Sequence, residues 1–339
     1  MQIAAREATQ PARKPRNEAP VFVLGCGRSG TTLLYHMILS AGDFAVYRTE
    51  SNAINLLEPR FGDLRIRKNK ERLMDAWVDS RLFRESGLDS CQIRDRVLDE
   101  CQNGGDFLRI IMGEMARQQG VRRWADCTPE HILYLDRIKE TIPDALIIHI
   151  IRDGRDNALS MNKGNWIRPL PGHQKRGLMV AGLYWEWMVN KGCEGGRRLG
   201  NDYTEVHFEE LVTQPRETLA RLGAFIEHDL DYDRIHKVGI GSVKEPNTSF
   251  QSKNGAPFNP VGRWKEKFPP AELRKFERLV GKTLEELGYP LATTQSSALE
   301  TLDLKSLRSL YRTYFNSKLW LKAKTPLGKL LVTEELKWI

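Results

Sequence analysis

The feature that most constrains the fold is an apolar run followed directly by a glycine-rich loop and a helical run. The segment Val21-Phe-Val-Leu24 is short, apolar and rich in β-branched or aromatic residues, which predicts a buried strand. A loop with the pattern Gly25-x-x-x-x-Gly30 follows it, and residues 31–40 read as a helix. Strand, glycine loop and helix in that order form half of a βαβ unit, so the chain is expected to contain a parallel α/β sheet.

Later segments repeat this order. Residues 145–151 form a second β-rich apolar run, and Arg152-Asp-Gly-Arg-Asp156 leads from it into a helix that reaches about residue 162. Residues 205–208 form a weaker third strand, followed by a helix after Pro215. Further helices are predicted at 69–83, 107–119, 178–199, 216–227 and 270–287. We therefore predict an α/β fold of three layers, in which helices flank a central parallel sheet.

The positive charge lies at the two ends of the chain. The 339 residues carry a formal net charge of +8, but the net charge of residues 21–303 is zero. Seven basic residues and no acidic residue lie between Leu304 and Thr333. A broad nucleic-acid-binding surface is therefore not expected. We predict a flexible arm at residues 1–20, a catalytic domain at 21–300 and a basic helical tail at 301–339.

The tail is amphipathic, because its apolar residues recur at helical spacing between Lys and Arg. Such a helix, at residues 304–332, is suited to contact with an anionic membrane or an acidic partner, or it docks on the domain with its basic side in water. The sequence shows neither a secretory signal nor a membrane-spanning run. The five cysteines are odd in number and form no CxxC pair. We expect a soluble, cytoplasmic protein whose tail is suited to peripheral contact with a membrane.

The glycine loop has the spacing of a phosphate-binding loop, in which backbone N–H groups and a helix terminus surround an anion. A nucleoside-triphosphate loop would place Lys directly after Gly30, and this chain has Thr31 there. It has instead Arg28 within the loop, which suits bidentate contact with a tetrahedral oxyanion. A P-loop kinase or NTPase remains the alternative enzyme.

Four segments resemble the sulfotransferases that use 3′-phosphoadenosine 5′-phosphosulfate (PAPS), of the bacterial or tyrosylprotein type. Residues 20–34 resemble their 5′-phosphosulfate loop, and Arg152-Asp-Gly-Arg-Asp156 with Ser160 resembles their 3′-phosphate motif. The segment Gly262-Arg-Trp-Lys265 resembles their C-terminal cofactor loop, and residues 206–212 resemble their V-x-Y-E-x-L-V segment. The resemblance spans about residues 20–288 and implies a P-loop-like fold with both phosphate sites at the carboxyl ends of strands.

The resemblance also implies an activity and a set of cofactor-binding residues. The protein would move a sulfuryl group from PAPS, as co-substrate, to a hydroxyl of an acceptor, without a metal. That acceptor is a carbohydrate, lipid, small molecule or tyrosine, and the sequence identifies neither it nor the oligomeric state. The residues expected to bind PAPS are Gly25, Gly27, Arg28, Ser29, Gly30, Thr31, Thr32, Arg152, Ser160, Phe208, Gly262, Arg263 and Trp264.

Two positions depart from the family pattern. Cys127 stands where many relatives have a Lys that neutralises the sulfuryl group, and Phe208 replaces a Tyr. A thiol cannot supply that positive charge, so another cation must do so; the candidates are Arg28, Arg168, Lys253 and Arg263. These departures keep open the alternative of a non-catalytic, cofactor-binding member of the family.

The reaction needs a base for the acceptor hydroxyl as well as Arg28 for the transferring group. Our first candidate is Glu50, which lies 22 residues after Arg28, about where tyrosylprotein-type relatives carry their catalytic Glu. His131 is the second candidate because it follows Thr128-Pro129, where a loop is expected to approach the site. Asp126 and His173 are weaker candidates.

Overall fold

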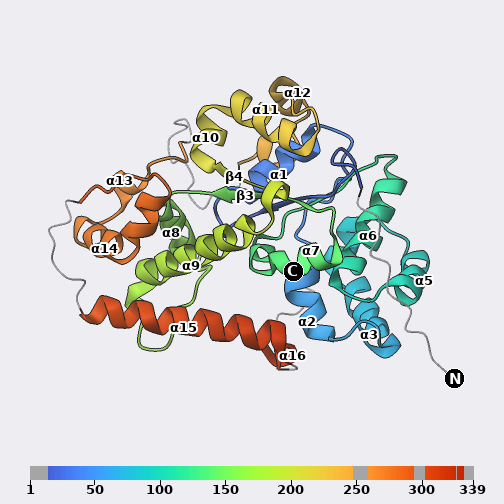
Figure 1. The fold of residues 1–339 in the computed structure, drawn as a ribbon, viewed down its shortest axis with the longest axis horizontal. Helices are drawn as coiled ribbons and strands as arrows, with labels where there is room; N and C mark the ends of the chain where they lie inside the picture. Colours follow the sequence, from blue (N-terminus) through green and yellow to red (C-terminus); the bar gives the residue numbers. More distant parts are fainter. Residues whose placement is uncertain (1–13, 247–258, 294–301, 326, 332–339) are drawn as a thin grey trace.

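A parallel sheet of four strands forms the centre of the molecule (Figure 1). The computed structural model describes residues 14–246, 259–293, 302–325 and 327–331. The strand order is β2-β1-β3-β4, with every neighbouring pair parallel. The strands are β1 (Val21–Leu24), β2 (Ala125–Asp126), β3 (Leu146–Ile151) and β4 (Tyr203–His207). The predicted parallel sheet is confirmed, and the two-residue strand β2 is an addition that the sequence pattern did not reveal.

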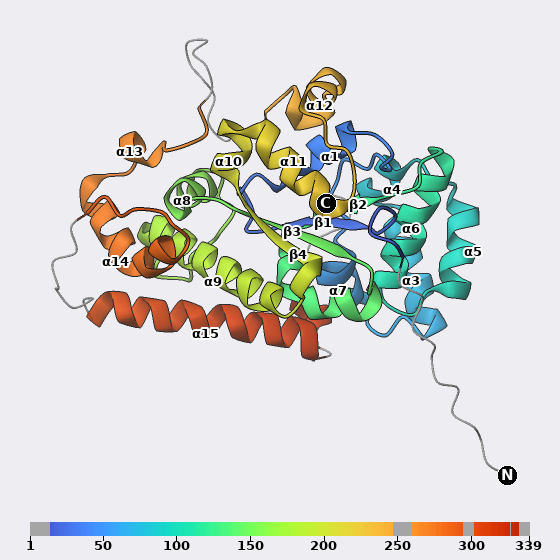
Figure 2. The ribbon, with the colours of Figure 1, turned by 45° about the horizontal axis from the view of Figure 1, so that its top comes forward.

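The two faces of the sheet belong to separate apolar cores. Val23 and Ile148 point into a core shared with helices α1 (Thr31–Ser40) and α11 (Pro215–Ile226). Phe22, Leu24, Ile147 and Ile151 point into a second core, shared with α6 (Gly104–Gln118), α7 (Leu135–Thr141) and α9 (Gly177–Arg197). Figure 2 shows these helices on opposite sides of the strands. Both faces are covered, so the central strands β1 and β3 are almost entirely apolar, and the predicted three-layer architecture is confirmed.

Most predicted helices occur within a few residues of their expected bounds. The helix predicted at 69–83 is two helices, because Ser80 interrupts it: the Ser80 hydroxyl accepts a hydrogen bond from the Phe83 N–H at 3.2 Å and caps the second one. The remaining elements are α2 (Glu58–Phe61), α3 (Arg67–Val78), α4 (Arg81–Ser86), α5 (Ser90–Glu100), α8 (Gly154–Lys163), α10 (Phe208–Thr213), α12 (Tyr232–Val238), α13 (Trp264–Lys267), α14 (Pro270–Glu286), α15 (Leu302–Lys324) and α16 (Gly328–Leu331), with the π-helical turn η1 (Ala53–Leu57) and the 3₁₀ turns η2 (Pro129–Tyr134), η3 (Gln174–Arg176), η4 (Gly200–Asp202) and η5 (Gly241–Val243).

The described parts of the two charged ends both contact the domain. Residues 1–13 of the predicted arm lie outside the described residues, whereas Arg16 donates a hydrogen bond to the Phe225 carbonyl at 2.6 Å. The tail contributes the long helix α15, which lies along α9 (Figure 1). Its apolar side is buried, through Leu304, Leu307, Tyr311 and Phe315. None of the described helices is both long and apolar enough to cross a membrane.

Tyr311 gives a test of how α15 is held. Its side chain is fully buried, and its hydroxyl accepts a hydrogen bond from the Leu170 N–H at 2.9 Å. Tyr311→Phe keeps the ring and leaves that N–H without its partner, so the free energy of unfolding should fall by about 1 kcal/mol in urea titrations. Tyr314→Phe on the same helix is the matched control, because Tyr314 is exposed, and it should change little. Equal effects of the two substitutions would contradict this role of the hydroxyl.

Candidate active site

The glycine loop lies at the carboxyl end of β1 and turns into α1. Gly30 precedes the helix with φ 97°, and neither an acidic residue nor a side-chain cap lies at the first turn of α1. The helix N-terminus therefore keeps its positive electrostatic potential, which suits a bound anion. A Cβ atom at Gly30 would lie 2.3 Å from Cδ2 of Phe208, so only glycine fits where the Phe208 ring meets the loop.

Arg152 joins the end of β3 to this loop. Its Nη1 donates to the Arg28 carbonyl at 3.0 Å, and its Nη2 donates to the Pro260 carbonyl at 2.6 Å. The guanidinium lies over the Phe208 ring, 4.6 Å from the ring centroid. Within the described residues its Nε is buried and has no hydrogen-bond partner. A phosphate oxygen would satisfy that donor, so the residues present fit an anion at this point.

Arg28 connects the two predicted phosphate motifs. Its Nε donates to the Ser160 hydroxyl of α8 at 3.2 Å, and its guanidinium lies 5.5 Å from the centre of the Trp166 ring. Burial and the nearby charge of Arg152 lower the pKa of Arg28, although a guanidinium stays protonated at any physiological pH. Two arginine charges therefore share one edge of the sheet, an arrangement that a multiply charged anion would stabilise.

Asn157 is a loop-supporting residue that the sequence analysis missed. Its Nδ2 donates to the Gly27 carbonyl at 3.0 Å and to the Ser29 hydroxyl at 2.9 Å. Its Oδ1 lies 3.7 Å from Sγ of Cys26, which donates to it. Asn157 precedes Ser160 by three residues, so the helical period places both on the side of α8 that faces the loop. The three-residue spacing between Asn157 and Ser160 is the sequence pattern from which Asn157 could have been predicted.

Asp156 holds the predicted C-terminal cofactor loop against α8. Its two carboxylate oxygens accept hydrogen bonds from the Gly262 N–H at 2.7 Å and the Trp264 N–H at 2.8 Å. The Arg155 guanidinium lies 3.7 Å from the centre of the Trp264 ring. Burial, followed by the positive charge of Arg152, lowers the pKa of Arg263. The two guanidinium groups therefore lie within electrostatic range of each other. The structure thus brings all four predicted segments together.

Cys127 lies beside the phosphate loop, and its thiol forms a hydrogen bond with Thr31. Burial, followed by the charge of Glu50, raises the pKa of Cys127 well above its usual value, so the thiol is neutral. Among the candidate replacements for the missing lysine, Arg28 lies in the loop and Arg168 is exposed. Lys253 lies outside the described residues.

Glu50 lies close to Cys127 and to two other carboxylates. Burial, followed by the negative charges of Asp126 and Glu130, raises the pKa of Glu50 to about 7, although its side chain still reaches solvent. Such a carboxyl is about half ionised at neutral pH, and it is close in pKa to an ideal general base.

His131, the second candidate base, is fully buried with both ring nitrogens in hydrogen bonds. Its Nδ1 lies 2.9 Å from Oδ2 of Asp126, and its Nε2 accepts from the Ile54 N–H at 3.3 Å. Burial raises the pKa of Asp126, but its interactions with His131 and other donors hold it below its usual value. The other weaker candidate, His173, contacts the Tyr311 hydroxyl at 3.2 Å. His131 therefore ties η2 to η1, and Glu50 is the candidate that keeps an accessible carboxyl.

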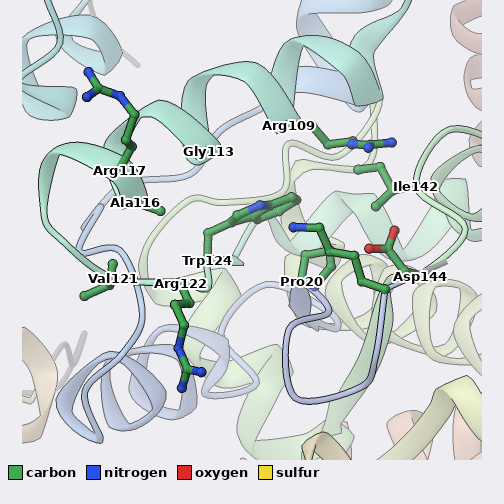
Figure 3. Close-up of a pocket in the computed structure, with 11 residues that line it drawn as sticks. Pro20, Arg109, Gly113, Ala116, Arg117, Val121, Arg122, Trp124, Ile142 and Asp144 are labelled. Carbon is green, nitrogen blue, oxygen red and sulfur yellow. The ribbon is translucent and has the colours of Figure 1, made fainter. Parts of the chain in front are cut away.

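A cavity of about 410 Å³ lies at the opposite edge of the sheet (Figure 3). Pro20, Trp124 and Asp144 line it, and these residues precede β1, β2 and β3. The cavity therefore opens at the amino ends of the strands, away from the phosphate loop. It is not part of the site described above.

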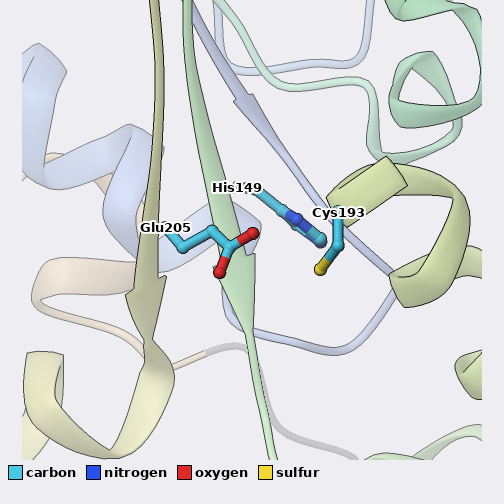
Figure 4. A group of neighbouring side chains, drawn as sticks. All are labelled: His149, Cys193 and Glu205. Carbon is cyan, nitrogen blue, oxygen red and sulfur yellow. The ribbon is translucent and has the colours of Figure 1, made fainter. Parts of the chain in front are cut away.

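A second group of reactive side chains consists of His149, Cys193 and Glu205 (Figure 4). One potential ligand atom from each lies within 4.8 Å of the others. The Tyr203 hydroxyl links two of them, because it lies 2.7 Å from Nδ1 of His149 and donates to Oε1 of Glu205 at 2.7 Å. This hydrogen-bond network accounts for the cluster, and we assign it no ligand.

The sequence profile of the sulfotransferase family matches residues 20–232. The chain belongs to the sulfotransferase family. The match contains the phosphate loop, Glu50, Arg152 and Ser160, and it ends before α13, α14 and α15. Family membership favours the sulfotransferase hypothesis over a P-loop kinase.

Individual relatives agree with this assignment. Mouse sulfotransferase 1B1 is 25% identical over 174 residues, which cover 45% of this chain and 58% of that protein. The chain thus spans less than two thirds of the length of this curated relative. Among solved structures, the sulfotransferase domain of a Synechococcus olefin synthase has a TM-score of 0.56 at 19% identity, covering 83% of this chain and 98% of that domain. The sulfotransferase domain of the curacin biosynthetic pathway also scores 0.56, at 15% identity, covering 83% and 100%. These two similarities concern the fold.

The contacts of Asn157 give a test of the site in this member of the sulfotransferase family. Asn157→Ala removes the donor that holds both the Gly27 carbonyl and the Ser29 hydroxyl. We expect the affinity for 3′,5′-adenosine bisphosphate (PAP) to fall about tenfold in calorimetric titrations, because the loop loses its fixed shape. Asn162→Ala, at an exposed position of the same helix, is the matched control. Unchanged affinity in Asn157→Ala would show that the loop does not depend on this contact.

Proposed function

We propose that this member of the sulfotransferase family transfers a sulfuryl group from PAPS to a hydroxyl of an acceptor. The observation that carries the proposal is the pair of bonds between the phosphate loop and the second motif: Arg152 Nη1 to the Arg28 carbonyl, and Arg28 Nε to Ser160. These bonds support one continuous anion site at the carboxyl edge of the sheet, as the two phosphorylated ends of PAPS would need.

Each predicted cofactor residue has a role in this proposal. Arg28 and the backbone from Gly25 to Thr32 face the 5′-phosphosulfate, while Arg152 and Ser160 hold the 3′-phosphate. Phe208 positions the Arg152 guanidinium by stacking. The loop with Gly262, Arg263 and Trp264 closes the Arg152 side of the site. The arginines and backbone N–H groups supply positive potential at the site, so we propose that no metal is required.

PAPS, when bound, supplies the sulfuryl group and a phosphorylated nucleotide as leaving group. We propose that the acceptor oxygen attacks sulfur while the bond from sulfur to the 5′-phosphate oxygen breaks, and that Glu50 takes the proton of the acceptor hydroxyl. PAP is the second product. Arg28 and the N-terminus of α1 stabilise the charge on the sulfuryl and leaving-group oxygens, which compensates for the neutral thiol of Cys127.

We also propose a cytoplasmic location and no nucleic-acid partner. All five cysteines are free thiols, as expected in a reducing compartment. The neutral charge of residues 21–303 opposes broad nucleic-acid binding. The exposed side of α15, with Trp320 60% exposed, supports contact of the tail with an anionic membrane or an acidic partner.

The activity is tested by ligand preference and by turnover. PAP should raise the thermal unfolding temperature more than ATP with Mg²⁺ does; the reverse order would favour a P-loop kinase. An acceptor screen read by the mass gain of one sulfate then separates an enzyme from a non-catalytic member of the family. Tight PAP binding without turnover across a broad acceptor panel would favour the latter.

Glu50→Gln tests the base. We expect kcat to fall by about 10²–10⁴-fold with PAP affinity unchanged, because the amide cannot accept the proton and the donor site is intact. Glu85→Gln, a carboxylate paired with Arg81 on the surface, is the control and should keep full activity. An unchanged kcat in Glu50→Gln would transfer the role to another group.

The pH profile tests the environment of Glu50. Because Glu50 must be ionised, kcat/KM should fall as the pH is lowered through about 7. Glu130→Gln removes a negative charge that raises the pKa of Glu50, so this acidic limb should move to lower pH. A limb that stays in place, or moves to higher pH, would exclude Glu50 as the titrating group.

A further inference from the structure

Helix α15 lies outside the family match, yet it contacts η2 beside the candidate base Glu50. Its Phe315 ring packs edge-on against Tyr184 of α9, with ring centroids 5.4 Å apart. Its Lys322 Nζ lies 3.4 Å from Oε2 of Glu130. Burial, followed by the charges of Glu130 and Cys26, raises the pKa of Tyr184. Tyr184 therefore packs against α15 and lies within electrostatic range of Cys26 in the phosphate loop.

Glu130 is the centre of a polar cluster that links four elements. It accepts hydrogen bonds from Nδ2 of Asn55 in η1 at 3.3 Å and from Lys322 of α15 at 3.4 Å, and it is hydrogen-bonded to Tyr184. Its negative charge contributes to the raised pKa of Glu50. The cluster is therefore within electrostatic reach of the proposed base, and α15 is one of its four components.

The same helix holds the segment that covers Arg28. Tyr311 bonds to the backbone of Leu170, and Asp303 pairs with Arg176 at 3.0 Å. Between α8 and these anchors the chain passes through Trp166, whose ring lies over Arg28. The helix thus fixes the loop on one side of the site and the Glu130 cluster on the other.

Lys318 is an exposed cation beside the Glu130 cluster. Asp126 is hydrogen-bonded to His131, and Glu130 is paired with Lys322, whose side chain is only 16% exposed. Lys318 lies one helical turn before Lys322 and is exposed. Burial raises the pKa of Glu130, but Lys322, Asn55 and then Lys318 hold it below its usual value, so Lys318 lies within electrostatic reach of the cluster. Lys318 forms no ion pair with the residues that the structure describes.

We propose that α15 forms a wall of the acceptor site and that Lys318 favours acceptors that carry a negatively charged group besides the hydroxyl. A carboxylate or phosphate on the acceptor would be attracted to Lys318 while its hydroxyl lies at Glu50. The inference rests on the proposed function, because it identifies the acceptor class for that same site.

A series of phenols that differ in charge tests this proposal. The probes are 4-hydroxyphenylacetate, 4-hydroxyphenylacetamide and tyramine, which share one hydroxyl and carry a negative, a neutral and a positive group. With PAPS as donor, kcat/KM should be about fivefold higher for the anion than for the amide, and lowest for tyramine. In Lys318→Met the anion and the amide should become equal. Lys324→Met, an exposed lysine of the same helix, should keep the wild-type order.

Binding measurements separate the failure of this proposal from the failure of the proposed function. PAP binding is measured first; its absence would reject the function itself. If PAP binds, the three phenols are titrated into the PAP complex by calorimetry, which does not depend on turnover. The anion should bind about fivefold tighter than the amide in wild type and equally in Lys318→Met. Equal affinities in wild type, no binding of the anion, or the same loss of preference in Lys324→Met would overturn the role of Lys318.

Discussion

The parallel pairing of β1 with β3 is the interaction on which the site depends. Leu24 pairs with His149, so the loops that follow both strands leave the sheet at the same edge. Parallel strands have their carboxyl ends side by side, and the helix that follows each strand begins there. This arrangement places the phosphate loop against the start of α8, where Arg152 and Arg28 meet. The remaining contacts of the site refine a geometry that the sheet has already set.

The site gathers positive charge locally in a domain that is neutral as a whole. The groups proposed to hold a multiply charged anion are few: two arginines, the N-terminus of α1 and the predicted cofactor loop. Each is fixed by a neighbour that carries no net positive charge itself, such as Asn157 under the loop and Asp156 under Gly262 and Trp264. Fixed donors need no reorganisation when charge develops, which is the physical basis of electrostatic catalysis. A neutral thiol at Cys127 therefore makes Arg28 more important.

The carboxylates on the acceptor side differ in what surrounds them. Asp126 is buried and bonded to His131, which keeps it ionised and inaccessible. Glu130 is held by Lys322 of a helix that arrives from the far end of the chain. For Glu50, neither a cation nor a hydrogen-bond donor among the described residues offsets the effect of burial on its pKa. Burial and the negative charges of Asp126 and Glu130 therefore raise the pKa of Glu50 to about 7. Similar carboxyl groups thus take different roles because their surroundings differ.

The amino-acid sequence by itself determined the parallel α/β fold and the positions of the two phosphate motifs, because strand, glycine loop and helix are local patterns with strong backbone preferences. It could not separate Glu50 from His131, because hydrogen bonds to Asp126 and Ile54 are contacts between separate loops. It also did not identify Asn157. For the tail it allowed three placements: on an anionic membrane, on an acidic partner or docked on the domain. Only the tertiary structure placed α15 along α9 and Lys322 beside Glu130, because which side of an amphipathic helix is buried depends on the surface it meets.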